Sequence, residues 1–150
     1  MYILKSKIAA EHLIFSMKYS FWYNFMGKHN EFGKEGEQIA ADFLQKKGYT
    51  ISYRNYRYLK AEIDIIAKKD EIVAIVEVRS RRSDYIENIA ETVTKKKINL
   101  LVMAADYYIL SVDLDVEVRF DIITILKNKN RFEIEHLENA FYHFWTLLAL

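Results

Sequence analysis

Two acidic residues lie inside apolar runs, where an acidic side chain is least expected. Asp64 stands within the run Ile63–Ile66, and Glu77 stands within the run Ile72–Val78. A carboxylate buried on an apolar strand without a partner is costly, so such a position is rarely filled by chance. We therefore take Asp64 and Glu77 as candidates for chemistry.

The spacing of these runs predicts that the two carboxylates lie close together. Residues 61–67 and 72–78 are both of strand length, and the four polar residues 68–71 that join them are typical of a hairpin. Side chains alternate between the two faces of a strand. A hairpin that preserves this parity places Asp64 on the face of Glu77, opposite either Ile75 or Glu77 itself.

A third carboxylate comes from a predicted helix over residues 31–47, where Glu37 shares a face with Ala40, Ala41 and Leu44. Three inward carboxylates repel one another unless a cation compensates them. Mg²⁺ or Mn²⁺, held by Glu37, Asp64 and Glu77, would do so and would activate water for attack on phosphorus. The alternatives are that Glu37 is a first-turn acid favoured by the helix dipole, or that Asp64 or Glu77 is ion-paired with arginine or lysine.

The elements that would position these residues follow from periodicity. We expect strands at 51–58, 61–67, 72–78, 116–126 and 131–136, with turns at 68–71 and 127–130. Residues 79–88 are predicted to be a charged loop. A helix capped by Thr92 or Thr94 should run to about residue 110. Its buried face should carry Ile98, Leu101, Val102, Ala105 and Ile109. The order is that of an α/β sandwich, with helices covering a mixed sheet.

Composition limits the classes of function. The chain has 150 residues, 29% charged residues, a net charge of +1 and no cysteine. These values exclude wholesale disorder, a disulfide framework, a thiolate metal site and a cysteine nucleophile. No stretch reaches the roughly 18 uncharged apolar residues of a membrane span, and the first 26 residues lack the pattern of a secretory signal. We expect a cytoplasmic protein without stable membrane insertion.

Several short motifs, in order along the chain, resemble the PD-(D/E)XK nuclease superfamily. Within it, they resemble the YraN-type family of uncharacterised endonuclease-like proteins, which is related to archaeal Holliday-junction resolvases. The resemblance covers about residues 27–141. The motifs that carry it are Gly33–Glu37, Arg54–Arg57, Glu62–Ile66, Val76–Arg81, Lys97 with Leu101, Ala104–Ala105, Arg119–Asp121 and Ile134–Phe141.

The resemblance implies a restriction-endonuclease-like three-layer sandwich, a mixed β-sheet flanked by helices with the core order αβββαβ. It divides the chain into an extension at 1–26, a nuclease-like domain at 27–141 and an apolar tail at 142–150. Where this chain has Ala61 and Arg79, the family has glycine and lysine. In the family that lysine stabilises or deprotonates the attacking water, whereas arginine keeps its proton near neutral pH. Lys97 is the residue that would partly substitute.

The expected activity is divalent-metal-dependent endonucleolytic hydrolysis of structured or single-stranded nucleic acid, with DNA ahead of RNA. The catalytic candidates are Glu37, Asp64, Glu77, Arg79 and Lys97. Arg54, Arg57, Arg81 and Arg82 are the candidates for phosphate contact, and Tyr53, Tyr56 and Tyr58 could stack on unpaired bases. The alternatives are a non-catalytic nucleic-acid-binding module, because of Arg79, and an interaction protein that docks through its apolar ends. A homodimer is also left open.

Overall fold

The computed structural model describes residues 31–82 and 93–141. The predicted extension at 1–26, the tail at 142–150 and most of the predicted charged loop lie outside these ranges. The chain divides into two units, residues 1–34 and 35–150, and the fold described below is that of the second unit. Within the described ranges, no helix is long and apolar enough to cross a membrane.

Among residues 31–82 and 93–141, five strands form one mixed sheet in the order β1-β2-β3-β4-β5. Only the pairing of β3 with β4 is parallel, and α2 connects these two strands. The α/β class, the mixed sheet and the order of elements are therefore confirmed. The bounds are β1 Thr50–Tyr58, β2 Ala61–Lys69, β3 Ile72–Arg82, α2 Lys95–Val112, β4 Glu117–Asn128 and β5 Arg131–Leu137.

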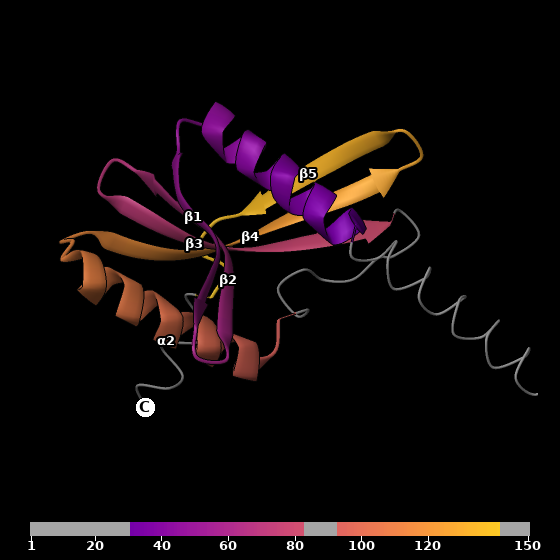
Figure 1. Ribbon diagram of the computed structural model, residues 1–150. Helices are drawn as coiled ribbons and strands as arrows, with labels where there is room; N and C mark the ends of the chain where they lie inside the picture. Colours follow the sequence, from indigo (N-terminus) through magenta and orange to yellow (C-terminus); the bar gives the residue numbers. More distant parts are fainter. Residues whose placement is uncertain (1–30, 83–92, 142–150) are drawn as a thin grey trace, which may run out of the picture. The chain divides into compact units, whose positions relative to one another are not determined.

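Two helices cover opposite faces of this sheet (Figure 1). The helix over residues 31–46 packs on one face through Ala40, Ala41 and Leu44, against β-strand residues such as Ile65 and Val76. On the other face α2 packs on a second core that includes Ile63 and Ile75. The arrangement is consistent with the predicted three-layer sandwich.

The ends of the helices follow their sequence signals. The 31–46 helix stops at Gly48, whose φ of 89° is easily reached only by glycine. Of the two predicted caps, Thr94 is the one used, because its hydroxyl accepts a hydrogen bond from the Lys97 amide at 3.2 Å. The predicted buried face of α2 was wrong at Val102 and Ile109, which are only partly buried. The buried positions of α2 are Ile98, Leu101, Ala104, Ala105 and Tyr108.

The prediction of a loop from residue 79 was wrong for its first four residues. Strand β3 continues to Arg82, and residues 72–82 pair in parallel with residues 117–127 of β4. Charged side chains are tolerated there because one face of the strand remains partly open, while the backbone is fixed by the neighbouring strand. Arg79 is therefore held on a strand, two residues from Glu77.

Strands β1 and β2 change direction together at Asn55 and Asp64. Arg54 pairs with Ile65 and Tyr56 pairs with Ile63, so Asn55 and Asp64 lie between these pairs. In a regular strand Ile63 and Ile65 would share a face, yet Ile63 packs on the α2 side and Ile65 on the other side. Asn55 has a φ of 51°, a conformation that asparagine tolerates. The kink turns the end of the β1–β2 hairpin toward α2.

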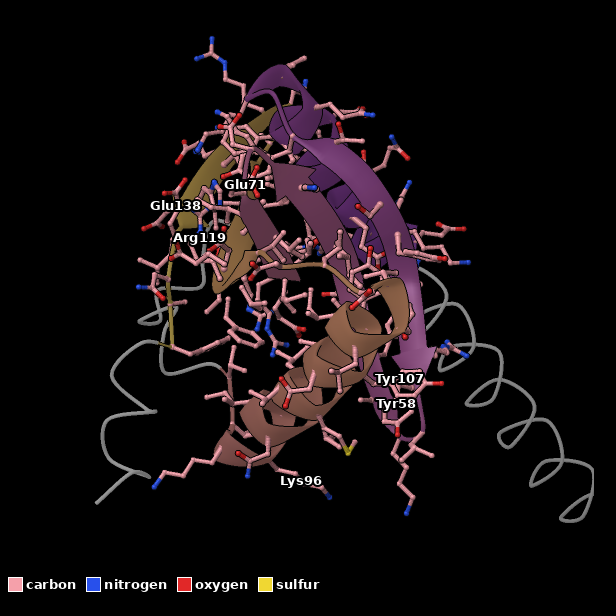
Figure 2. All side chains as sticks on the ribbon, turned by 90° about the vertical axis from the view of Figure 1, so that its left-hand side faces the viewer. Tyr58, Glu71, Lys96, Tyr107, Arg119 and Glu138 are labelled. Atoms are coloured by element: carbon pink, nitrogen blue, oxygen red, sulfur yellow. The ribbon has the colours of Figure 1, made fainter. Side chains whose placement is uncertain are left out.

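Contacts between tyrosine rings join the β1–β2 hairpin to α2. Tyr58 stacks on Tyr107 with ring centroids 4.0 Å apart (Figure 2). Tyr56 makes an edge contact with Tyr108 at 5.4 Å, and Tyr53 contacts both Tyr56 and Tyr108. Such pairs add about 0.5–1.5 kcal/mol each beyond burial. The tyrosines predicted to stack on bases therefore pack against other tyrosines, which gives them a structural role.

Gly36 brings the 31–46 helix close to the end of β3. A Cβ placed on Gly36 would overlap the Ser80 hydroxyl, and it would lie 3.2 Å from Ser80 Cβ. Only glycine allows this approach. Because Glu37 follows Gly36 directly, the same approach sets the distance of Glu37 from the end of β3.

We predict that Gly36→Ala lowers the free energy of unfolding by about 1–3 kcal/mol, as expected for overpacking. Gly33→Ala is the matched control, because a Cβ on Gly33 meets nothing within 4 Å. That variant should be as stable as the parent or more stable, by up to about 1 kcal/mol, since alanine favours helix. Adding Ser80→Ala to Gly36→Ala should recover part of the loss. Urea denaturation measures all four proteins, and equal stability of the two alanine variants would contradict the close approach.

Candidate active site

Asp64 lies where β2 leaves β3. The two strands pair from Lys69 and Ile72 to Ile65 and Val76. Continued by one residue, the same register sets Asp64 opposite Glu77. The other predicted partner of Asp64, Ile75, is excluded because Ile75 pairs with Ile66. At this point the Asp64 carboxylate accepts a hydrogen bond from the Val78 amide at 2.7 Å. A side chain thus bonds a β3 amide that lies two residues beyond Val76, the last paired residue.

The surroundings of Asp64 favour its protonated form. Burial is the main cause, and the nearby charge of Glu77 is the second, so that the pKa of Asp64 rises from 3.8 to about 7. The charge of Glu37 also raises the pKa, whereas the Val78 amide and Lys97 lower it. The charge of Glu77 therefore acts on the ionisation of Asp64, in agreement with the predicted proximity of the two strand carboxylates.

Glu77 is the buried centre of the site, with 4% of its surface exposed. Its Oε1 lies 3.3 Å from Arg79 Nη2, and its Oε2 lies 3.1 Å from Lys97 Nζ. Lys97 also donates a hydrogen bond to the Glu62 carbonyl at 3.1 Å. The first turn of α2 thus carries the ammonium group of Lys97 to Glu77.

One carboxylate oxygen of this site is incompletely satisfied. Glu77 Oε2 is buried and accepts no hydrogen bond, although it lies 3.1 Å from the ammonium group of Lys97. A hard divalent ion uses one or two carboxylates and several waters, so Asp64 and Glu77 fit such an ion. Glu37 influences Asp64 through its charge.

Three ligating side chains are not gathered into one cluster in this conformation. Among residues 31–82 and 93–141, no group of three Asp, Glu or His side chains is arranged to hold a metal ion. Lys97 and Arg79 already compensate much of the charge of Glu77. The role of Glu37 as a third ligand therefore stays a prediction.

The four arginines predicted to contact phosphate are not gathered into one cluster. Arg54 donates to Gln38 Oε1 at 2.6 Å, on the side of the 31–46 helix. Arg57 is exposed and pairs with Glu62 at 3.2 Å. Arg81 donates to the Ser80 carbonyl at 3.0 Å, and Arg82 is exposed at the end of β3. Arg81 and Arg82 continue the strand that carries Glu77 and Arg79, so they lie nearest to the site along the chain.

A second polar cluster was missed by the sequence analysis. Asp121 is fully buried and accepts two hydrogen bonds from Arg119, at 2.9 and 2.8 Å, and one from the Asn139 amide at 3.0 Å. His136 Nε2 lies 2.9 Å from it. Burial would raise the pKa of Asp121, but these bonds outweigh it and lower the pKa. The available signal was the buried acid of Arg119-Phe120-Asp121 on a predicted strand.

This cluster connects β4 with β5, the strand at one edge of the sheet. Arg119 also donates to the Tyr49 hydroxyl at 2.7 Å and pairs with Glu138 at 3.3 Å (Figure 2). Lys47, just past the end of the 31–46 helix, lies 3.0 Å from His136 Nδ1. Because Asp121 is satisfied on both oxygens, we interpret the cluster as structural: it fixes the helix and β5 against β4.

Comparisons with known proteins agree on one family. The model of the family described as "Uncharacterised protein family UPF0102" matches residues 36–125, a range that includes Glu37, Asp64, Glu77, Arg79 and Lys97. The chain is 51% identical over 119 residues to the UPF0102 protein FP2501 of Flavobacterium psychrophilum, covering 79% of this chain and all of that protein.

Two further relatives give the same result. The UPF0102 protein of Christiangramia forsetii is 47% identical over 119 residues, covering 79% of this chain and 100% of the relative. That of Phocaeicola vulgatus is 44% identical over 117 residues, covering 78% and 97%. The resemblance to the YraN-type family is thereby confirmed. The chain belongs to the UPF0102 family.

Proposed function

We propose that the chain is a divalent-metal-dependent endonuclease that hydrolyses phosphodiester bonds in structured or single-stranded nucleic acid. The observation that carries the proposal is the pair Asp64 and Glu77 at the point where β2 leaves β3. Burial and, second, the charge of Glu77 raise the pKa of Asp64 to about 7. A buried pair of carboxylates lowers the stability of the fold unless positive charge compensates it. Such a pair is therefore suited to a site that binds a cation.

Asp64 and Glu77 would hold Mg²⁺ or Mn²⁺, with Glu37 as the predicted third carboxylate. When bound, such an ion supplies positive charge to the phosphoryl oxygens and lowers the pKa of water. Residues of the chain orient the carboxylates and bind the phosphate charge. The Val78 amide fixes one oxygen of Asp64 through its 2.7 Å hydrogen bond, so the carboxylate is held in one orientation.

Arg79 and Lys97 approach Glu77 from two elements, β3 and α2. Arg79 keeps its proton, so it can bind a phosphate oxygen and stabilise charge in the transition state but cannot act as a base. Lys97 is the group near Glu77 that can lose a proton, and its ammonium is held within 3.1 Å of Glu77 Oε2. We assign the stabilisation of phosphate charge to Arg79. Lys97 is the residue that would partly take over the role of the family's lysine.

The competing proposal is a nucleic-acid-binding module without efficient chemistry. The observation that favours it is that Lys97 and Arg79 already neutralise Glu77, so the site can persist without a metal. In both proposals the partner is nucleic acid, DNA ahead of RNA, reached through Arg79 and the arginines that follow it on β3.

The Arg79 series tests the proposal. The parent should cleave DNA slowly with Mn²⁺ or Mg²⁺ and not at all with excess chelator. Arg79→Lys should preserve binding and raise the cleavage rate by about tenfold or more, since a positioned base contributes about 10²–10⁴. Arg79→Ala should weaken both binding and cleavage. Arg131→Lys, an exposed arginine beside the β4–β5 turn, is the matched control and should change neither.

Two outcomes of this series would count against parts of the proposal. If Arg79→Lys and Arg79→Ala both cleaved at the rate of the parent, Arg79 would have no catalytic role. If the parent and Arg79→Lys both stayed inert on DNA and RNA with Mn²⁺, the binding-module proposal would replace the nuclease.

The raised pKa of Asp64 predicts an unusual pH dependence of stability. The folded carboxyl titrates near 7 and the unfolded one near 3.8. Between these values the folded state therefore binds more protons, and stability falls as pH rises. Without metal, the parent should be about 1–2 kcal/mol more stable at pH 5.5 than at 7.5 through this group. The readout is the difference between the parent and Asp64→Asn in urea unfolding.

The exposed Asp70→Asn, in the β2–β3 turn, is the control and should keep the parent's profile. Mg²⁺ should stabilise the parent at pH 7.5, where Asp64 is ionised, and should leave Asp64→Asn unchanged. A parent profile identical to that of Asp64→Asn would show that folding does not raise the pKa of Asp64.

A further inference from the structure

Buried polar atoms without hydrogen-bond partners gather beside the carboxylate pair. Within residues 31–82 and 93–141 these side-chain atoms are Glu77 Oε2, Arg79 Nε, Thr124 Oγ1 and Ser80 Oγ. A buried donor or acceptor without a partner is destabilising. Thr124 is 8% exposed and is the one member that lies on β4.

Three of these four atoms lie on one face of the sheet. Arg79 and Thr124 are paired residues of the parallel strands β3 and β4, and such neighbours project to the same face about 5 Å apart. Ile122, two residues before Thr124, packs in the α2-side core, so Thr124 faces that side. Glu77 faces it as well, because it meets Lys97 of α2. Ser80 projects to the other face, toward Gly36.

We propose that Thr124 and Arg79 form a binding site for a phosphate oxygen, with the Thr124 hydroxyl and Arg79 Nε as its two donors. This inference rests on the proposed function and adds to it a residue on β4. Both groups donate hydrogen bonds, and a phosphate oxygen accepts several. The Arg79 side chain is 26% exposed, so an oxyanion can reach Nε through rotation of the guanidinium group.

The charges around Thr124 are compatible with an anion. Arg79 contributes a permanent positive charge, and Lys97 offsets the charge of Glu77 at 3.1 Å. On the other side, Glu135 pairs with Thr124 across β4 and β5 and is exposed. Water and salt screen the charge of an exposed carboxylate, so its repulsion is weak. A bound divalent ion at Asp64 and Glu77 would strengthen the site.

The test uses the full chain, without metal and with excess chelator, titrated with inorganic phosphate and followed by NMR chemical shifts. Thr124→Val keeps the shape of the side chain and removes the hydroxyl. We expect its phosphate affinity to fall about tenfold, the effect of one hydrogen bond to a charged group. Thr124→Ser should restore the affinity to within about twofold of the parent. Thr50→Val, at the exposed start of β1, is the control and should bind as the parent does.

A second readout separates binding from folding. Thr124→Val removes an unpartnered buried hydroxyl, so its free energy of unfolding should be equal to or above that of the parent. Sulfate should compete with phosphate, whereas chloride at the same ionic strength should not. Equal phosphate affinity of Thr124→Val and Thr50→Val would overturn the inference, as would a parent that binds no phosphate.

The inference and the proposed function fail in different ways. If the parent cleaves DNA with Mn²⁺ while Thr124→Val keeps the parent's phosphate affinity, the nuclease stands and the role of Thr124 is overturned. If the parent cleaves nothing but phosphate binding depends on the Thr124 hydroxyl, the phosphate site stands on a binding module.

Discussion

The hydrogen bond between the Val78 amide and the Asp64 carboxylate is the interaction on which the site depends. It forms beyond the last paired residues of β2 and β3, so a side chain, rather than the neighbouring backbone, bonds the Val78 amide. The departure of β2 makes room for polar groups inside an otherwise apolar sheet. The kink at Asn55 and Asp64 accompanies it and turns the hairpin toward α2. Without this departure, Asp64 and Glu77 would be two paired residues of a continuous sheet.

Groups from both faces of the sheet act on the carboxylates at this point. The 31–46 helix contributes the charge of Glu37, and its close approach at Gly36 depends on the absence of a side chain. From the other face, the first turn of α2 brings Lys97 to Glu77. The tyrosine contacts and the Asp121 cluster hold the hairpin, the helix and β5 in place. The packed layers thus keep like charges together that would otherwise separate.

Much of this arrangement could be predicted from the sequence, because apolar periodicity determines which strands pair and which face is buried. The class, the order of elements and the proximity of Asp64 and Glu77 follow from apolar periodicity and strand alternation. What could not be predicted depends on breaks in that regularity. The extension of β3 to Arg82 comes from pairing with β4. The approach of Lys97 to Glu77 and the unpartnered Thr124 hydroxyl require the tertiary fold, since neither has a local sequence signal.

The most direct test of the account is to locate Mn²⁺ by its anomalous scattering in crystals of the parent and of Glu77→Gln. The account predicts one peak in the parent within bonding distance of the Asp64 and Glu77 carboxylates, and no such peak in Glu77→Gln. A parent without a peak there would contradict the central claim. So would a parent whose manganese lies elsewhere, such as at the exposed Glu138, and the carboxylate pair would then be a structural feature held by Arg79 and Lys97.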